Sequence, residues 1–202
     1  MNFSETTYST TPFLKFVWCL VLSAALYFVM TRAVNYFTLT PESYTPYFWS
    51  RVNWVLPHVI SGIVTILLGP LLFFLPPAGR AHKRVFWVYS IAVLIGSVCA
   101  VYLSITSQVS TLYASGLLGL TVAWVFATAM MLYKFAQAFA YRAWLRRSYI
   151  VTFSFVLFWS GVKLLELLDV GDPFSRMAIM SWLCWLVPLL VVEVYCYFIR
   201  RS

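Results

Sequence analysis

The apolar run between the only two histidines constrains this chain more than any other feature. From Val59 to Pro77 the chain has no charged side chain, and this length is close to the roughly 20 apolar residues that a helix needs to cross a bilayer. His58 precedes the run and His82 follows it. The run therefore predicts a transmembrane helix with one histidine near each end.

Composition predicts the same environment for the whole chain. Of 202 residues, 62% are hydrophobic and 10% are charged, whereas a soluble domain has about 25% charged residues. A water-soluble fold is therefore excluded, and the lipid bilayer is the expected partner. The net charge of +8 does not indicate nucleic acid, because the basic residues cluster between apolar runs. The four cysteines show no metal-binding spacing, which predicts buried thiols.

Six apolar runs of about 20 residues divide the chain. The predicted spans are 13–34, 54–75, 85–107, 112–135, 148–168 and 177–199. The expected fold class is an all-α integral membrane protein, a six-transmembrane-helix bundle forming a single membrane domain over residues 1–202. The aromatic connection 35–53 is expected to lie on the outer interface and cap the bundle.

The basic residues predict the orientation. Ten lie in one set of connections and ends: Lys15, Arg80, Lys83, Arg84, Lys134, Arg142, Arg146, Arg147, Arg200 and Arg201. The opposite set has three: Arg32, Arg51 and Arg176. Cytoplasmic connections carry the excess of Lys and Arg, so both termini are predicted to be cytoplasmic.

Small residues every four positions predict close helix packing in the third and fourth spans. The third span has Ala92, Gly96, Ala100 and Ser104, and the fourth has Ser115, Gly119, Ala123 and Ala127. Each set lies on one helix face, and small residues allow helices to approach closely in lipid. We expect the two stripes to face each other. The alternatives are that they line a pore or contact another subunit.

Three ionisable residues inside the spans are candidates for function, because such groups are costly in lipid. Lys163 and Glu166 are one turn apart near the outer end of the fifth span, where they can pair or extend to the interface. Glu193 has no basic residue within four positions on its own helix. It is either protonated or paired with His82, Lys134 or another inner cation, which leaves a structural tie and a functional site both open.

The two histidines are expected to act separately. They are 24 residues apart, about 36 Å along a helix, so they cannot bind one metal ion or haem together. His58 is predicted near the outer interface, bonded to the aromatic connection. His82 is predicted in a basic inner loop, where it can bind an anionic headgroup or nucleotide with Lys83 and Arg84.

Three short segments carry a resemblance to a known family. The first is His58-Val-Ile-Ser-Gly62 with Leu68-Gly69-Pro70 and Phe73-Phe74, the second is His82-Lys83-Arg84 with Tyr89, and the third is Trp144-Leu-Arg-Arg147-Ser148-Tyr149 with Thr152-Phe153. In order and spacing they resemble a bacterial predicted-membrane-protein family catalogued as domain of unknown function 2306. The resemblance covers roughly His58 to Phe153.

That resemblance implies a small multi-span protein of the bacterial inner membrane, without an established activity. The family pattern commonly has a further histidine where this chain has Tyr141. A histidine pair there could hold a haem or metal, and this chain breaks the pair. Tyrosine is an uncommon haem ligand, so the departure weakens a redox role.

Three hypotheses of function follow. The first is a non-enzymatic accessory subunit, or a small-molecule or lipid-binding bundle, with protein subunits or anionic lipid at the inner face as partners. The second is a haem-binding redox protein, and the third is a small-molecule or proton-coupled transporter using Glu193. The chain lacks the common catalytic motifs, so no catalytic residue is assigned and an enzyme is not expected. The candidate ligand-binding residues are His82, Lys83, Arg84, Tyr141, Arg142 and Glu193 on the inner side, with His58, Lys163 and Glu166 on the outer side.

Overall fold

The chain folds into long helices that match the predicted spans. The computed structural model describes residues 12–42, 49–107 and 109–201, within which it has no strand and six helical segments long and apolar enough to cross a membrane. The helices are α1 Pro12–Phe28, continued by the π-helical η1 Val29–Ala33 and the 3-10 helix η2 Val34–Thr38, then α3 Val52–Phe74, α4 Arg80–Ile105, α5 Thr111–Tyr133, α6 Ala138–Leu167 and α7 Pro173–Arg201. The all-helical, six-span fold class is confirmed.

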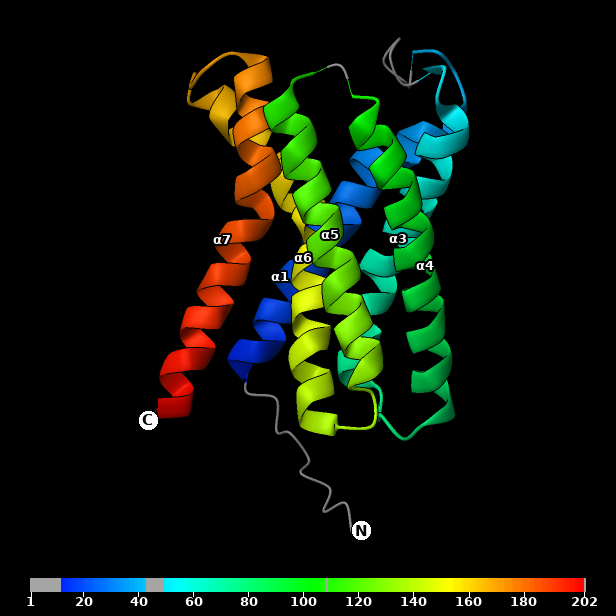
Figure 1. The fold of residues 1–202 in the computed structure, drawn as a ribbon, viewed down its shortest axis with the longest axis vertical. Helices are drawn as coiled ribbons and strands as arrows, with labels where there is room; N and C mark the ends of the chain where they lie inside the picture. The colour runs from blue at the N-terminus through cyan, green and yellow to red at the C-terminus, as the bar shows by residue number, and fades with distance from the viewer. Residues whose placement is uncertain (1–11, 43–48, 108, 202) are drawn as a thin grey trace.

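Successive helices run in opposite directions. As a result α1 begins and α7 ends at the same end of the bundle, where the α3–α4 and α5–α6 connections also lie (Figure 1). We call this the basic end, because the basic residues predicted on the inner side belong to these segments. The assignment of this end to the cytoplasm stays a prediction from the charge bias.

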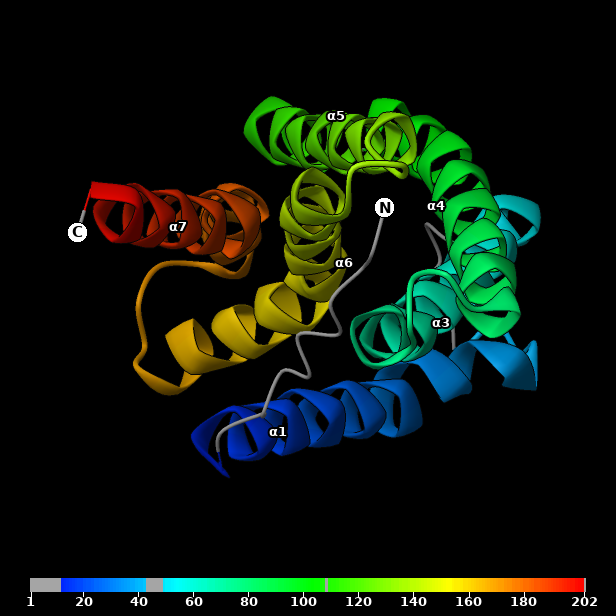
Figure 2. The ribbon, with the colours of Figure 1, turned by 90° about the horizontal axis from the view of Figure 1, so that it is seen from below.

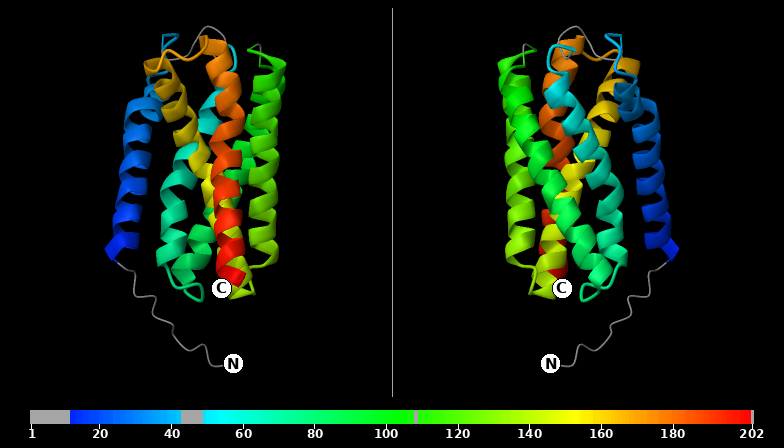
Figure 3. Two further views of the ribbon diagram at one scale, coloured as in Figure 1. Left: turned by 90° about the vertical axis from the view of Figure 1, so that its left-hand side faces the viewer. Right: turned by 90° about the vertical axis from the view of Figure 1, so that its right-hand side faces the viewer.

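Four helices form the centre of the bundle. Helices α3, α4, α5 and α6 pack in sequence, and α3 also contacts α6, which closes the ring (Figure 2). The main core lies among these helices, with Tyr89, Trp124, Met131, Tyr141 and Leu145 almost fully buried. Helix α7 packs on α5 and α6, and α1 lies on the outside against α3 and α6 (Figure 3). Most of the buried polar side chains thus lie on α3–α6, and Ser181 of α7 is a further one among the described residues.

Several helices extend beyond the predicted spans. Helix α6 begins at Ala138, ten residues before the span predicted from 148, and α4 begins at Arg80 rather than 85. Its 30 residues make α6 about 45 Å long, enough to cross both headgroup layers as well as the hydrocarbon. Charge therefore ends the apolar span without ending the helix, since Arg is a good helix former. Tyr141 and Arg147 are consequently helical residues.

The first span also ends later than predicted, because η1 and η2 continue it to Thr38. The connection predicted over 35–53 is correspondingly shorter. Its residues 43–48, with the aromatic side chains Tyr44, Tyr47 and Phe48, lie outside the described residues. Of the neighbouring aromatics, Trp54 stacks on Tyr102 of α4 with ring centroids 4.3 Å apart.

The pairing predicted for the two small-residue stripes is wrong. A Cβ on Gly96 of α4 would meet Ser61 of α3 at 3.1 Å and the Trp124 ring at 3.3 Å, while one on Gly119 of α5 would meet Trp185 of α7 at 3.1 Å. The stripes therefore face different neighbours, although α4 and α5 are adjacent. Four-residue spacing defines a shared helix face, but it does not determine which helix covers that face.

Candidate functional site

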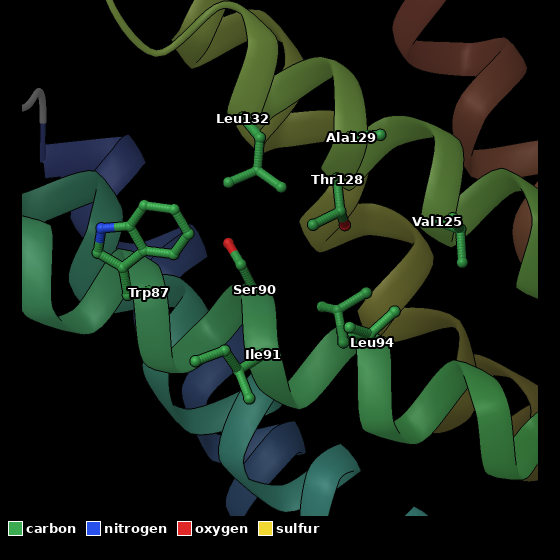
Figure 4. Close-up of a pocket in the computed structure, with 9 residues that line it drawn as sticks. Trp87, Ser90, Ile91, Leu94, Val125, Thr128, Ala129 and Leu132 are labelled. Atoms are coloured by element: carbon green, nitrogen blue, oxygen red, sulfur yellow. The ribbon is translucent and has the colours of Figure 1, made fainter.

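A hollow between α4 and α5 opens toward the lipid side of the bundle in its basic half. It has a volume of about 230 Å³ and is lined by Trp87, Ser90, Ile91, Val93, Leu94, Val125, Thr128, Ala129 and Leu132. Figure 4 shows Trp87 and Leu132 at one end and Leu94 and Val125 at the other. Trp87 is 59% exposed and Leu94 is 61% exposed. The α4–α5 hollow is thus an apolar groove that a molecule in the membrane can enter from the side.

Ser90 supplies the polar atom that points into the α4–α5 hollow (Figure 4). Its hydroxyl donates to the carbonyl oxygen of Phe86 at 2.8 Å, a common way for a helical serine to satisfy its proton. The lone pairs of Ser90 Oγ still face the hollow. The other hydroxyl of the lining, that of Thr128, bonds Ser148 Oγ of α6 at 2.8 Å, which anchors this wall of the hollow to the centre of the bundle.

Thr128 belongs to a buried hydroxyl cluster that joins α4, α5 and α6. The cluster consists of Tyr89, Trp124, Thr128, Ser148 and Thr152, each at most 4% exposed. Tyr89 Oη lies 2.8 Å from Ser148 Oγ and 2.9 Å from Thr152 Oγ1. Trp124 Nε1 donates to Thr152 Oγ1 at 2.8 Å. These interhelical bonds matter in lipid, where little else replaces a lost partner.

The proton of each hydroxyl in the cluster can be placed, because each hydroxyl has one proton. Thr152 donates to the Ser148 carbonyl, which can only accept. Tyr89 must then donate to Thr152, and Ser148 must donate to Tyr89. Thr128 is left to donate to Ser148. All five donors, the Trp124 indole included, are thus satisfied inside the protein.

His82 lies in the first turn of α4 and is completely buried. Its Nδ1 is 3.2 Å from the Leu75 carbonyl oxygen, and its Nε2 is 2.8 Å from Tyr141 Oη. Since the carbonyl only accepts, Nδ1 carries the proton and the neutral Nε2 accepts from Tyr141. The structure thus brings together His82 and Tyr141, which the sequence had placed at the same end, and uses them to tie α3, α4 and α6.

Lys83 and Arg84 do not share the environment of His82, contrary to the expected joint site. Both side chains are exposed while the imidazole points into the bundle. The physical reason is that adjacent helical residues are about 100° apart. His82 therefore cannot contact an anion held by its two neighbours without leaving its buried partners.

Glu193 has a cationic partner from a neighbouring helix. Arg147 of α6 binds it with two bonds, Nε to Oε1 at 2.5 Å and Nη2 to Oε2 at 2.8 Å. The guanidinium also lies over the Trp144 ring, 4.6 Å from its centroid. Glu193 is 47% exposed at its side chain, so it is neither sealed in apolar packing nor part of the α4–α5 hollow. Of the alternatives for Glu193, this geometry supports a tie between α6 and α7.

The outer-side candidates are separated from one another. His58 Nδ1 lies 3.0 Å from the Gly96 carbonyl oxygen of α4, and its ring meets the edge of Phe155, so its described hydrogen bond is with the bundle rather than with the aromatic connection. Lys163 Nζ and Glu166 Oε2 are 3.0 Å apart and both are about half exposed. Of the two alternatives given for these residues, the pairing is present in the structure. Exposed pairs of this kind contribute little to stability.

The turn between α6 and α7 is formed by Asp169, Gly171 and Asp172. Asp169 has φ 52° and Gly171 has φ 66°, both in the left-handed region that turns use. Asp172 accepts from the backbone N–H groups of Phe174 and Ser175, as an N-cap does. The Ser175 hydroxyl, followed by the Ser175 backbone N–H, holds the pKa of the Asp172 carboxyl below its usual value.

A haem iron or metal ion held jointly by His82 and Tyr141 does not fit this packing. Their nearest atoms are 2.8 Å apart, whereas two donors about 2 Å from one ion on opposite sides are about 4 Å apart. The second imidazole nitrogen is engaged with Leu75. Among the residues that the structure describes, no group of three His, Cys, Asp or Glu side chains could hold a metal ion. Haem binding stays a prediction that this geometry does not favour.

The α4–α5 hollow and the hydroxyl cluster are the features that sequence reasoning missed. Signals for both exist in the sequence. Lys83, Trp87, Ser90 and Leu94 follow helical spacing and lie on one face of the helix. This spacing indicates a largely apolar helix face with a basic residue at one end. Tyr89, Ser148 and Thr152 all fall in the segments that carry the family resemblance, and the structure shows that they meet.

Together the six spans, the lipid-facing hollow and the buried polar centre define a multi-pass helical membrane protein. The family model described as Predicted membrane protein (DUF2306) matches residues 55–196. The match covers more than two thirds of the chain, from α3 through most of α7, so the chain belongs to this family and the resemblance is confirmed. No match is found among curated proteins or among solved structures.

Proposed function

We propose that the protein is a lipid-binding helical bundle that holds a membrane-soluble chain in the α4–α5 hollow. The observation that carries this proposal is the hollow itself, which is apolar and open to the bilayer. Its lining has no acidic, basic, histidine or cysteine side chain. Such a lining supports binding of an apolar chain rather than its chemical conversion, since acid–base and nucleophilic chemistry need titratable or nucleophilic groups.

The size of the hollow supports a slender ligand. Its volume of about 230 Å³ is below the roughly 300–1,000 Å³ of pockets that enclose drug-sized molecules. From Trp87 to Leu94 the hollow follows two turns of α4, about 10 Å by helical rise. A single acyl chain lying along the helix has this shape, whereas a haem or a folded nucleotide does not.

The wall of the hollow is held in place by the hydroxyl cluster. Thr128 is bonded to Ser148, and through it to Tyr89 and Thr152. A preformed site loses less conformational freedom on binding than one that must be ordered. The cluster therefore supports a hollow that is present before any ligand arrives.

The test compares two substitutions of Ser90, whose side chain points into the hollow. The protein is purified in neutral detergent, mixed with phosphatidylglycerol and phosphatidylcholine of the same acyl chains, and examined by native mass spectrometry. Ser90→Leu fills the hollow and is expected to lower lipid retention at least fivefold. Ser90→Ala removes the hydroxyl without filling the space and is expected to retain lipid. Equal retention by Ser90→Leu and the unmodified protein would contradict the proposal.

The other hypotheses have less support from the geometry. A redox role would need His82 to give up Tyr141 or Leu75, and a transporter would need a polar path to Glu193, which is instead engaged by Arg147. An accessory role with protein subunits remains compatible with a lipid-binding bundle. The proposed location is the bacterial plasma membrane, which the family resemblance implies.

A further inference from the structure

We infer that the lipid held in the α4–α5 hollow is anionic, with its headgroup bound by Lys83 and Arg84 of α4 and by Lys134, the residue that follows α5. This inference rests on the proposed function and names the ligand class of the same site. It stands on three observations: the position of the cations beside the hollow, the lack of acidic partners for them among the described residues, and the distance that the hollow extends from them along α4.

Lys83 and Arg84 continue the α4 lining of the hollow toward the basic end. Lys83 is four residues before Trp87, and Arg84 is three residues before it, so both lie within one turn of the hollow on α4. Lys134 follows Leu132 at the end of α5, and its Nζ lies over the exposed ring of Tyr133, 4.6 Å from the centroid. Because α4 and α5 are antiparallel neighbours, the start of α4 and the end of α5 lie together at the basic end of the bundle (Figure 1).

Among the described residues, no carboxylate neutralises these cations. No ion pair among the described residues involves Lys83, Arg84 or Lys134. The carboxylate described in the basic half, that of Glu193, is bound by Arg147 on the α6–α7 side. A lipid phosphate at the mouth would supply the missing negative charge, and each nearby cation attracts an anionic headgroup.

The depth of the hollow matches a molecule anchored by its head. Arg84 lies about 15 Å from Leu94 along the helix axis, toward the basic end. Long basic side chains can lie along an apolar helix with the charge at headgroup level. If the phosphate of a lipid is bound there, the first part of the acyl chain lies beside Trp87 and the following methylenes lie beside Ile91 and Leu94. Trp87 thus lies at the boundary, where an indole is favoured.

The experiment measures lipid preference in the purified full-length protein. Phosphatidylglycerol and phosphatidylcholine with identical chains are offered together, and the bound ratio is read by native mass spectrometry. Arg84→Gln is compared with Arg146→Gln, which removes the same charge from an exposed position on α6 at the same end. Size-exclusion profiles and thermal unfolding confirm that both variants remain folded.

The unmodified protein is expected to retain phosphatidylglycerol in excess. Arg84→Gln is expected to reduce that excess about fivefold, the effect of one cation near a headgroup, while Arg146→Gln leaves it within twofold. Equal binding of the two lipids by the unmodified protein, or equal losses in the two variants, would overturn the inference but leave the proposed function standing if Ser90→Leu still lowers retention. Failure of Ser90→Leu to lower retention would overturn the proposed function itself.

Discussion

At the residue scale, the pairing of His82 with Tyr141 shows how a polar residue is used in this bundle. The imidazole is completely buried and both nitrogens have partners. A buried polar group is tolerated when its hydrogen bonds are made. If one partner is removed, the fold is destabilised by the desolvation free energy of the unpaired group. His82, which the sequence presents as a candidate ligand-binding residue, therefore contributes to helix packing.

Tyr141→Phe tests this interpretation. The change removes the donor to His82 Nε2 while keeping the ring, so the buried nitrogen loses its partner. We expect the free energy of unfolding to fall by about 1–2 kcal/mol, measured by denaturant titration in detergent micelles. Tyr133→Phe, on a ring that is 75% exposed, serves as the control and should leave stability unchanged. Equal stability of both variants would show that the bond contributes nothing.

At the element scale, hydrogen bonds and glycines determine which helices stay together. The hydroxyl cluster joins α4, α5 and α6, while Gly116 and Gly161 admit Ser181 and Met180 of α7 at close approach. Toward the basic end α7 leans away from the bundle (Figure 1), and Arg147 and Glu193 connect it there to α6. Apolar attraction is weak between helices in lipid, so these specific contacts decide the arrangement.

Thr152→Val tests the hydroxyl cluster. Valine has the same shape but accepts no hydrogen bond, so the Trp124 N–H and the Tyr89 hydroxyl both lose their acceptor. We expect destabilisation of about 1–3 kcal/mol, together with a shift in the fluorescence of the buried tryptophan. Thr121→Val is the matched control, because the hydrogen bond described for its hydroxyl is to the Leu117 carbonyl of its own helix. If both changes have the same effect, the interhelical bonds are not what stabilises the bundle.

At the scale of the whole molecule, the antiparallel order places both ends of the described chain at the basic end (Figure 1). The charge bias across the bundle then predicts which side of the membrane that end faces. The same end has the mouth of the α4–α5 hollow. The proposed headgroup would therefore belong to the cytoplasmic leaflet, whose surface is enriched in anionic lipid.

A C-terminal fusion tests this orientation. Green fluorescent protein fused after Ser202 is expected to fluoresce in cells, whereas alkaline phosphatase at the same point should be inactive because it folds only outside the cytoplasm. A phosphatase fusion after Gly171, in the α6–α7 turn at the opposite end, provides the reverse control and should be active. The opposite pattern would invert the orientation and move the headgroup to the outer leaflet.

Hydropathy and charge along the sequence are sufficient to predict the number of helices, their approximate extent and the end at which the basic residues gather. Hydropathy and charge act over one span and its flanks, and the resistance of lipid to unpaired backbone groups makes each span a helix. The sequence also indicated that Lys163 and Glu166 can pair, because the two residues are one turn apart on the same helix.

Tertiary structure alone decided which faces meet. The small-residue stripes that contain Gly96 and Gly119 have the expected spacing but contact different neighbours. Glu193 is bound by Arg147 rather than by His82 or Lys134. Partner choice depends on the rotation of each helix about its axis and on its place in the bundle, and no local pattern encodes either. For the same reason the hydroxyl cluster, which joins α6 to α4 and α5, and the α4–α5 hollow are evident only in the folded protein.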